Sequence, residues 1–152
     1  MLQLIKDYQP DVACFQEMVG SDNVPEAINY IPDFMREERF EDYHYSYNPK
    51  LNFDNEHHFG IITFSKYPII NKGEMTFIAS PVLVLYSDIK ISDHQTIRVY
   101  NCHLQSYSID PDDYSTIDSI GSASGRQHIK EARKISYKLR TGFKLRAYQA
   151  RK

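Results

Sequence analysis

Apolar residues gather in short runs separated by polar turns, a pattern typical of a chain built mainly from strands. The runs VACFQE (12–17) and HFGIITFS (58–65) are apolar at consecutive positions, as in strands covered on both faces. Residues 43–47 alternate tyrosine with polar residues, which predicts a half-exposed strand. The other predicted strands are 74–80 and 82–91, on either side of Pro81, and 96–104.

Helical periodicity occurs at the start of the chain and between the first two strands. Residues 1–8 read as an amphipathic helix that ends before Pro10, because proline disfavours helix in the residue before it. A second helix is predicted from about Val24 to Met35. Pro32 lies inside this range and is expected to kink or shorten the helix.

The C-terminal third of the chain contains a polar segment followed by a basic helix. Residues 106–125 are rich in Ser, Asp and Gly and are predicted to be a long loop that is either mobile or functional. Ser124 and Gln127 have the spacing of a capping box, so a helix is predicted over 126–152. Ten of the 18 Lys and Arg residues lie in residues 121–152, which hold one of the 20 acidic residues. This excess of positive charge has three possible interpretations. The segment forms an anion-binding patch, or it pairs with the acidic remainder of the chain, or it is a solvated helix face.

The order of the elements indicates the fold class. A helix, a strand and a helix precede a run of antiparallel strands and a basic helix, which is typical of sheets flanked by helices. The length of 152 residues fits one domain, and 41% hydrophobic with 25% charged residues is ordinary for a globular protein. No apolar stretch reaches the roughly 18 residues of a membrane helix, and no signal peptide is visible. The compartment of the protein is left open.

Two residues at strand ends are candidates for chemistry. Glu17 closes the first apolar strand, where an ionised carboxylate needs a cation or hydrogen-bond donors, and a hard divalent ion would satisfy it. His103 closes the strand TIRVYNCHL in the same way and is able to contact a phosphate oxygen or transfer a proton. The alternatives are that Glu17 caps the following turn and that His103 is structural.

Four motifs, taken in order, resemble those of the endonuclease/exonuclease/phosphatase superfamily. They are PDVACFQE (10–17), FGIITFSKYPI (59–69), IRVYNCHLQS (97–106) and RAYQA (146–150). The resemblance implies an α/β fold, the four-layer α/β/β/α sandwich of the DNase I-like type. It also implies hydrolysis of a phosphate ester with Mg²⁺, or with Mn²⁺ in its place. The substrates that it implies are a nucleic acid, a phospholipid headgroup or a small phosphoester.

The resemblance assigns roles to particular residues. Glu17 matches the family's metal-binding glutamate and His103 matches the histidine near the scissile phosphate, so both are expected to be catalytic. The positions that match the family's scaffold are Gly60, Ser65, Pro68 and Asn101.

Departures from the family pattern are as informative as the matches. The family's first strand, with a catalytic Asn, would precede Met1, and its Gly-Asp-Phe-Asn and later Ser-Asp-His motifs are absent. Ser92-Asp93-His94 precedes the His103 strand and is interpreted as a chance match in a hairpin turn. Residues 1–152 are therefore expected to be a partial domain that is inactive by itself and that self-associates through uncovered sheet edges.

Two other functions compete with this reading. The first is a zinc hydrolase that uses three or four of the imidazoles of the chain, but the spacing of a zinc motif is absent. The histidines considered for it are His44, His57, His58 and His103. The second is a non-catalytic module in which the basic helix 126–152 contacts nucleic acid or an anionic lipid surface.

Overall fold

A computed structural model describes most of the chain and divides it into two compact units. The first unit is Met1–His103 and the second is Leu104–Lys152. None of the described helices is both long enough and apolar enough to span a membrane. The described residues are 2–21, 29–49, 57–77, 80–104, 106–107, 109–120 and 126–151.

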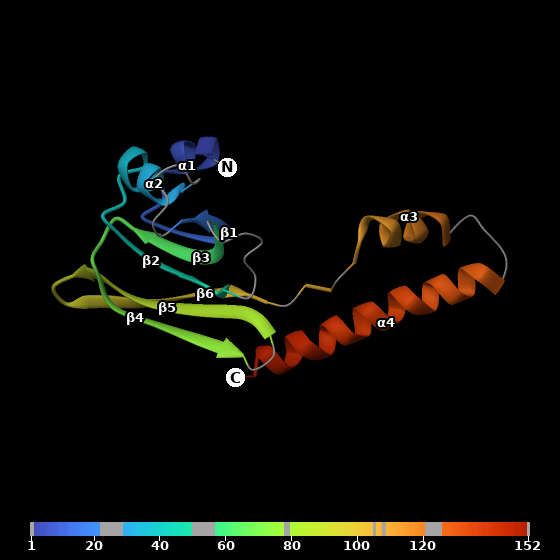
Figure 1. The fold of residues 1–152 in the computed structure, drawn as a ribbon. Coiled ribbons are helices and arrows are strands. Elements are labelled where there is room, and N and C mark those ends of the chain that lie inside the picture. The colour runs from blue at the N-terminus through green and yellow to red at the C-terminus, as the bar shows by residue number, and fades with distance from the viewer. Residues whose placement is uncertain are drawn as a thin grey trace. The chain divides into compact units, whose positions relative to one another are not determined.

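The first unit has three layers, which are two sheets and a pair of helices (Figure 1). Its elements are α1 (Leu2–Tyr8), β1 (Val12–Gly20), α2 (Ile31–Glu37), β2 (Asp42–Tyr47), β3 (His58–Ser65), β4 (Ile69–Phe77), β5 (Ser80–Ser92) and β6 (Gln95–His103). One sheet has the order β1-β3-β2 and the other β4-β5-β6, and every pairing is antiparallel. The helices α1 and α2 cover the first sheet on the side away from the second (Figure 1). The predicted mixed α/β class with two sheets is confirmed.

Strand β3 lies at the centre of the first sheet, and its alternating side chains serve both faces. Ile62 and Phe64 belong to the core beneath the helices, whereas Ile61 packs with Leu85 of the second sheet. Gly60 is required for close packing, because a Cβ atom there would lie 2.4 Å from the Ser46 carbonyl oxygen.

The core beneath the helices is aromatic. The Phe64 ring stacks on Phe34 at 5.4 Å and on Phe40 at 5.2 Å between ring centroids, and Phe15 meets both Phe34 and Phe64 edge-on. Each such pair contributes about 0.5–1.5 kcal/mol beyond the burial of its area. These contacts fix α2 against the sheet that carries Glu17.

Two prolines lie in positions that differ from the predicted ones. Of the helix predicted from about Val24 to Met35, residues 24–28 lie outside the described part, and the described helix begins at Ile31. Pro32 therefore lies in the first turn, where its missing N–H is tolerated, and it does not kink the helix. Pro81 does not separate two strands but lies near the start of β5, a position that proline also tolerates.

The second unit contains α3 (Pro111–Ile120) and α4 (Arg126–Gln149). The prediction of a long loop is wrong for residues 111–120. Asp110 Oδ1 accepts a hydrogen bond from the Asp113 N–H at 2.9 Å, and Asp113 Oδ2 accepts one from the Asp110 N–H at 3.0 Å. This reciprocal cap, with Pro111 at the first helical position, starts a helix despite its polar composition. Ser124, the predicted cap of α4, lies outside the described residues.

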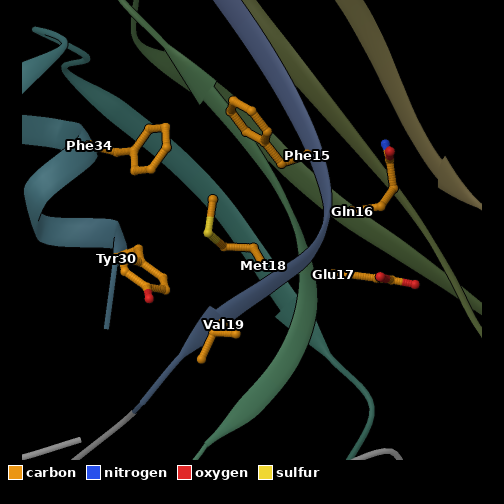
Figure 2. A pocket seen from close by; sticks show the side chains of 7 residues that line it. All are labelled: Phe15, Gln16, Glu17, Met18, Val19, Tyr30 and Phe34. Atoms are coloured by element: carbon orange, nitrogen blue, oxygen red, sulfur yellow. The ribbon is translucent and has the colours of Figure 1, made fainter. Parts of the chain in front are cut away.

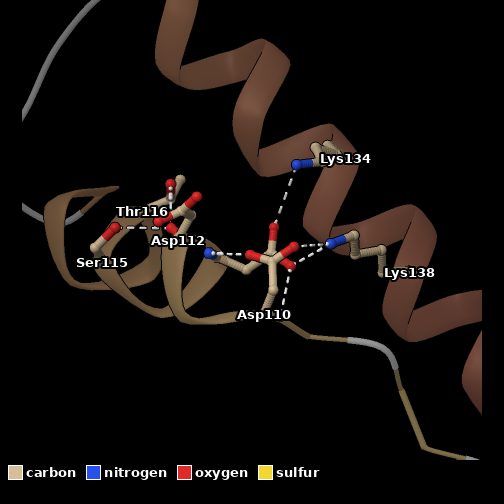
Figure 3. A network of polar contacts seen from close by, with 7 residues as sticks. Asp110, Asp112, Ser115, Thr116, Lys134 and Lys138 are labelled. Carbon is tan, nitrogen blue, oxygen red and sulfur yellow. Dashed lines mark hydrogen bonds and ion pairs between the residues drawn. The ribbon is translucent and has the colours of Figure 1, made fainter. Parts of the chain in front are cut away.

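Charged side chains join α3 to α4 (Figure 3). Lys138 Nζ donates to Asp110 Oδ2 at 2.8 Å and also to Asp113, and Lys134 Nζ lies 3.6 Å from Asp113 Oδ1. Hydrogen bonding to Lys138 lowers the pKa of the Asp113 carboxyl from 3.8 to about 2. This helix pair therefore depends on an ionised aspartate.

An aromatic contact adds to this charged join. The Tyr107 ring lies 5.1 Å from the Phe143 ring between centroids, and the Arg146 guanidinium lies 4.7 Å from the Tyr107 centroid. Gly142 makes the approach possible, because a Cβ atom there would lie 2.4 Å from Tyr107 Cδ1. The glycine that weakens α4 as a helix is thus the residue that lets Tyr107 pack on it.

Candidate functional site

A β-bulge interrupts β1 at the residues predicted to carry chemistry. Gln16 and Glu17 together occupy the space opposite one residue of β3, Ile61. Glu17 has a φ of 58°, in the left-handed region that non-glycine residues rarely adopt. The pairs that flank the bulge are Phe15–Ile62 and Met18–Gly60.

The bulge changes which way the side chains point. Phe15 and Met18 both pack in the aromatic core. Gln16 and Glu17 are consecutive, yet both point to the opposite side of β1 from that core (Figure 2). A regular strand would send one of these two side chains into the core, because its residues alternate between faces.

The second sheet supplies the partners of both residues from β6. Gln16 Nε2 donates a hydrogen bond to Asn101 Oδ1 at 2.8 Å, and Glu17 Oε1 lies 3.7 Å from His103 Nε2. Asn101 and His103 are two residues apart and so share a face of β6. Because of the bulge, two consecutive residues of β1 contact two residues of β6 that are separated by one position in the sequence.

The predicted residues Glu17 and His103 are thus brought together, at the end of β6. The Glu17 side chain is 75% exposed and that of His103 is 40% exposed, so both are accessible to a ligand. Their separation exceeds the length of a hydrogen bond, which leaves the carboxylate oxygens available to other partners. Their catalytic roles remain a prediction.

Glu17 fits a hard divalent ion as a single ligand. Its carboxylate is exposed and faces an imidazole, and oxygen donors of this kind suit Mg²⁺. Over the described ranges, no three His, Cys, Asp or Glu side chains are grouped closely enough to hold a metal ion. Mg²⁺ commonly keeps several waters and uses one or two carboxylates with substrate phosphates, so one protein ligand makes a weak site.

The histidines considered for zinc lie in separate surroundings. His44 on β2 hydrogen-bonds through Nδ1 to Ser87 Oγ at 3.1 Å, and burial lowers the pKa of its imidazole. His58 stacks on Tyr47 with 3.9 Å between ring centroids, while His103 faces Glu17. The part of the chain that the structure describes therefore offers no support for a zinc centre.

Ser92-Asp93-His94 lies in the turn between β5 and β6, as predicted. Asp93 pairs with Lys90 at 2.8 Å, and the His94 N–H donates to Ser92 Oγ. This turn is at the opposite end of β6 from His103. It does not contribute to the site at Glu17.

A pocket of about 260 Å³ lies along β1 near α2 (Figure 2). Figure 2 shows Tyr30 and Phe34 on one side of β1 and the side chains of Gln16 and Glu17 on the other. The pocket thus adjoins the aromatic core and does not join Glu17 to His103. The residues that line it are Phe15, Gln16, Glu17, Met18, Val19, Tyr30 and Phe34.

Sequence reasoning missed the contribution of two residues. It gave Gln16 no role of its own and treated Asn101 as scaffold, yet the two form the hydrogen bond beside Glu17. The Gln-Glu and Asn-x-His pairs were the available signal. Their joint meaning depends on the bulge, which the sequence of β1 alone does not specify.

Known proteins provide a comparison with this arrangement. The family model described as "Endonuclease/Exonuclease/phosphatase family" matches residues 1–125. Among solved structures, an endonuclease/exonuclease/phosphatase family protein from Leptotrichia buccalis C-1013-b is 19% identical, with a TM-score of 0.51, over 82% of this chain and 53% of its own. The endonuclease/exonuclease/phosphatase from Beutenbergia cavernae DSM 12333 is 12% identical, with a TM-score of 0.54, over 80% of this chain and 37% of its own.

These likenesses confirm the predicted fold. The chain spans about half the length of the first structure and little more than a third of the second. No curated protein matches the chain.

Proposed function

The chain belongs to the endonuclease/exonuclease/phosphatase family, and from that premise we propose that it supplies part of a divalent-metal-dependent phosphoester hydrolase site. Glu17 is the metal ligand and His103 is the group that contacts the reacting phosphate. The observation that supports this most is the 3.7 Å approach of Glu17 Oε1 to His103 Nε2. A strained backbone at Glu17 adds support, because such strain often occurs at functional sites.

The two side chains have complementary tasks. Mg²⁺, or Mn²⁺, bound to Glu17 would polarise a phosphoryl oxygen and stabilise the charge that develops during hydrolysis. The His103 ring N–H donates a hydrogen bond to a phosphate oxygen beside the Glu17 carboxylate. This hydrogen bond orients the ester and offsets the negative charge of the phosphate. The substrate class is a phosphate ester, whether in a nucleic acid, a phospholipid headgroup or a small molecule.

The 152 residues alone are expected to be inactive. Phosphoryl transfer depends on positioning several charged groups together, and the described residues gather one carboxylate and one imidazole at this place. Neither Glu17 nor His103 is able both to activate the attacking water and to complete the coordination shell of a metal ion. We propose that further family elements complete the domain, in keeping with the share of the solved structures that the chain covers.

The assay is hydrolysis of plasmid DNA and of a generic phosphodiester by the purified chain with Mg²⁺ or Mn²⁺. The Glu17→Ala variant is the matched control. We expect no turnover above that control. Robust turnover that Glu17→Ala abolishes would show that the site is complete within these residues.

A protein that carries this sequence within the rest of the family domain allows the role of His103 to be tested. There we expect His103→Ala to lower turnover by about 10²-fold, as for a positioned acid–base or electrostatic group, with little change in stability. Unchanged turnover combined with lost stability would make His103 a structural residue.

One observation favours a second function, the binding of nucleic acid by α4. With a helix turn of about 100° per residue, Lys130, Arg133, Arg140 and Lys144 fall within an arc of about 80°. All four are exposed, and Tyr137 lies in the same arc with 72% of its surface exposed. A row of cations with an aromatic side chain suits phosphates and stacked bases.

Salt dependence tests this second function without Mg²⁺. We expect the chain to bind a short DNA duplex with an affinity that falls steeply as salt rises. The double variant Arg140→Gln/Lys144→Gln should reduce the slope of log K against log salt by about 0.9 for each phosphate that the helix no longer neutralises. Lys6→Gln/Arg36→Gln, which removes the same charge from the first unit, is the control. Equal effects of the two double variants, or binding only to anionic vesicles, would contradict it.

A further inference from the structure

Asn101 reaches from the second sheet into the backbone of the first. Its side chain is 2% exposed, and Nδ2 donates to the Ile62 carbonyl oxygen at 2.8 Å and to the Phe15 carbonyl oxygen at 3.3 Å. Its Oδ1 accepts the hydrogen bond from Gln16 Nε2 at 2.8 Å. One buried amide therefore contacts β1 and β3 of the first sheet at once.

The place of these contacts is informative. Phe15 and Ile62 form the last register pair before the bulge, and Gln16 is the first residue inside it. A bulge disrupts the ladder of backbone hydrogen bonds at this position, and the Asn101 amide adds a donor to one carbonyl oxygen on each of the two strands. Asn101 thus holds the backbone at the position where regular pairing stops.

We propose that Asn101 is a positioning residue that fixes the bulge of β1 and thereby aims Glu17 at His103. The inference rests on the proposed function for its catalytic meaning, although the bulge itself does not. A left-handed φ at a glutamate persists only where the surroundings impose it. If β1 paired regularly with β3, Gln16 and Glu17 would face opposite sides of the sheet and the carboxylate would leave His103.

The shared strand β6 makes the coupling direct. Asn101 and His103 lie on one face of β6, so the strand that holds the bulge also carries the partner of Glu17. This arrangement sets both ends of the Glu17–His103 contact. Asn101 acts through the backbone of β1 and is not itself proposed to touch substrate.

The test compares Asn101→Ala with Ser87→Ala in the full chain. Ser87 is a suitable control because it is fully buried in the same sandwich and also hydrogen-bonds across the two sheets. Its partner is His44, so its loss does not touch Gln16 or Glu17. The first readout is the backbone NMR chemical shifts of Glu17, which distinguish left-handed from extended conformation. The second is the paramagnetic broadening of the His103 ring by Mn²⁺, and the third is thermal stability.

We expect Asn101→Ala to move Glu17 toward the extended conformation and to weaken the Mn²⁺ effect on His103 by about tenfold, as when a metal ligand loses a residue that orients it. Ser87→Ala should lower stability but leave both local signals unchanged. A destabilised Asn101→Ala that keeps the left-handed Glu17 would overturn the proposal and leave Asn101 a purely structural residue.

A second variant covers the case in which Asn101→Ala does not fold. Asn101→Leu nearly keeps the volume of the buried side chain and removes its hydrogen bonds to the Phe15 and Ile62 carbonyl oxygens and to Gln16. A shift of the Glu17 resonances toward extended values supports the proposal, and unchanged resonances contradict it. Failure of the proposed function has a different signature, which is no Mn²⁺ broadening of His103 in the unaltered chain while Glu17 still responds to Asn101→Ala.

Discussion

Different interactions stabilise the interior of each of the two units. The first unit packs α1 and α2 on its sheet through a cluster of phenylalanines centred on the fully buried Phe64. The second unit joins α3 to α4 through Lys138, Asp110 and Asp113, with Tyr107 packed beside Gly142. Apolar burial is the stronger of these two sources of stability, because ion pairs near water are worth little and are screened by salt.

The difference explains why the candidate site lies in the first unit. A left-handed glutamate needs surroundings that resist relaxation, and packed phenylalanines with a buried asparagine provide them. The helix pair lacks such a core among its described residues, in which Ile135 is the one buried large aliphatic side chain. Its geometry is therefore expected to respond to pH and ionic strength, whereas the backbone conformation at the bulge is not.

The largest expected effect is that of emptying the aromatic core. Phe64→Ala should lower the free energy of unfolding of the first unit by about 3–5 kcal/mol, because the ring is fully buried and stacks on two others. The control is Phe143→Ala in the second unit, a ring that is 60% exposed, which should cost less than about 1 kcal/mol. Urea denaturation with amide exchange read separately for each unit measures both, and equal losses would erase the proposed contrast.

The next largest effect is that acid should destabilise the second unit more than the first. The pKa of Asp113 is lowered from 3.8 to about 2 in the folded chain, so its stabilising contribution is present above about pH 4 and is lost as the pH falls toward 2. Amide protection in α3 and α4 should fall over this range in the unaltered chain. Lys138→Met should already lack most of that protection at pH 6, with little further loss in acid. An unchanged α3 in Lys138→Met would mean that the charged join contributes nothing.

The smallest effect concerns the strained backbone at the bulge. Glu17→Gly should be more stable than Glu17→Ala by about 1 kcal/mol, because glycine adopts a positive φ without steric penalty. Both variants lack the carboxylate, so their difference reports the backbone alone. Thermal unfolding of the pair decides the matter, and an alanine variant as stable as the glycine one would argue against a left-handed residue at this position.

Local pattern was sufficient to predict much of the first unit. Strand β3 is apolar at consecutive positions because layers cover both of its faces, and the strand that ends at His103 was placed correctly. The sequence also predicted that Glu17 and His103 lie together, but for a reason that is wrong for Glu17. Strand β1 does not end at Glu17 but continues through the bulge to Gly20, so the bulge, and not a strand end, brings the carboxylate to His103.

Non-local pairing accounts for most of what was missed. The bulge depends on how β1 aligns with β3 and on Asn101, which lies 85 residues from Gln16 in the chain. No window of β1 contains that information. The start of α3 is a different case, because the sequence did contain the signal. Asp110 and Asp113 have the spacing of a helix cap, but the polar composition of residues 106–125 led to the prediction of a loop.

The most direct test of the central claim is a Mn²⁺ titration of the chain, followed by the NMR signals of the His103 ring. If Glu17 is a divalent-metal ligand beside His103, low concentrations of Mn²⁺ should broaden the His103 signals selectively, and Glu17→Ala should abolish the effect. His44, on another strand, should stay sharp at the same Mn²⁺ concentration. Broadening of His103 that persists in Glu17→Ala, or broadening of both histidines alike, would contradict the assignment of this site.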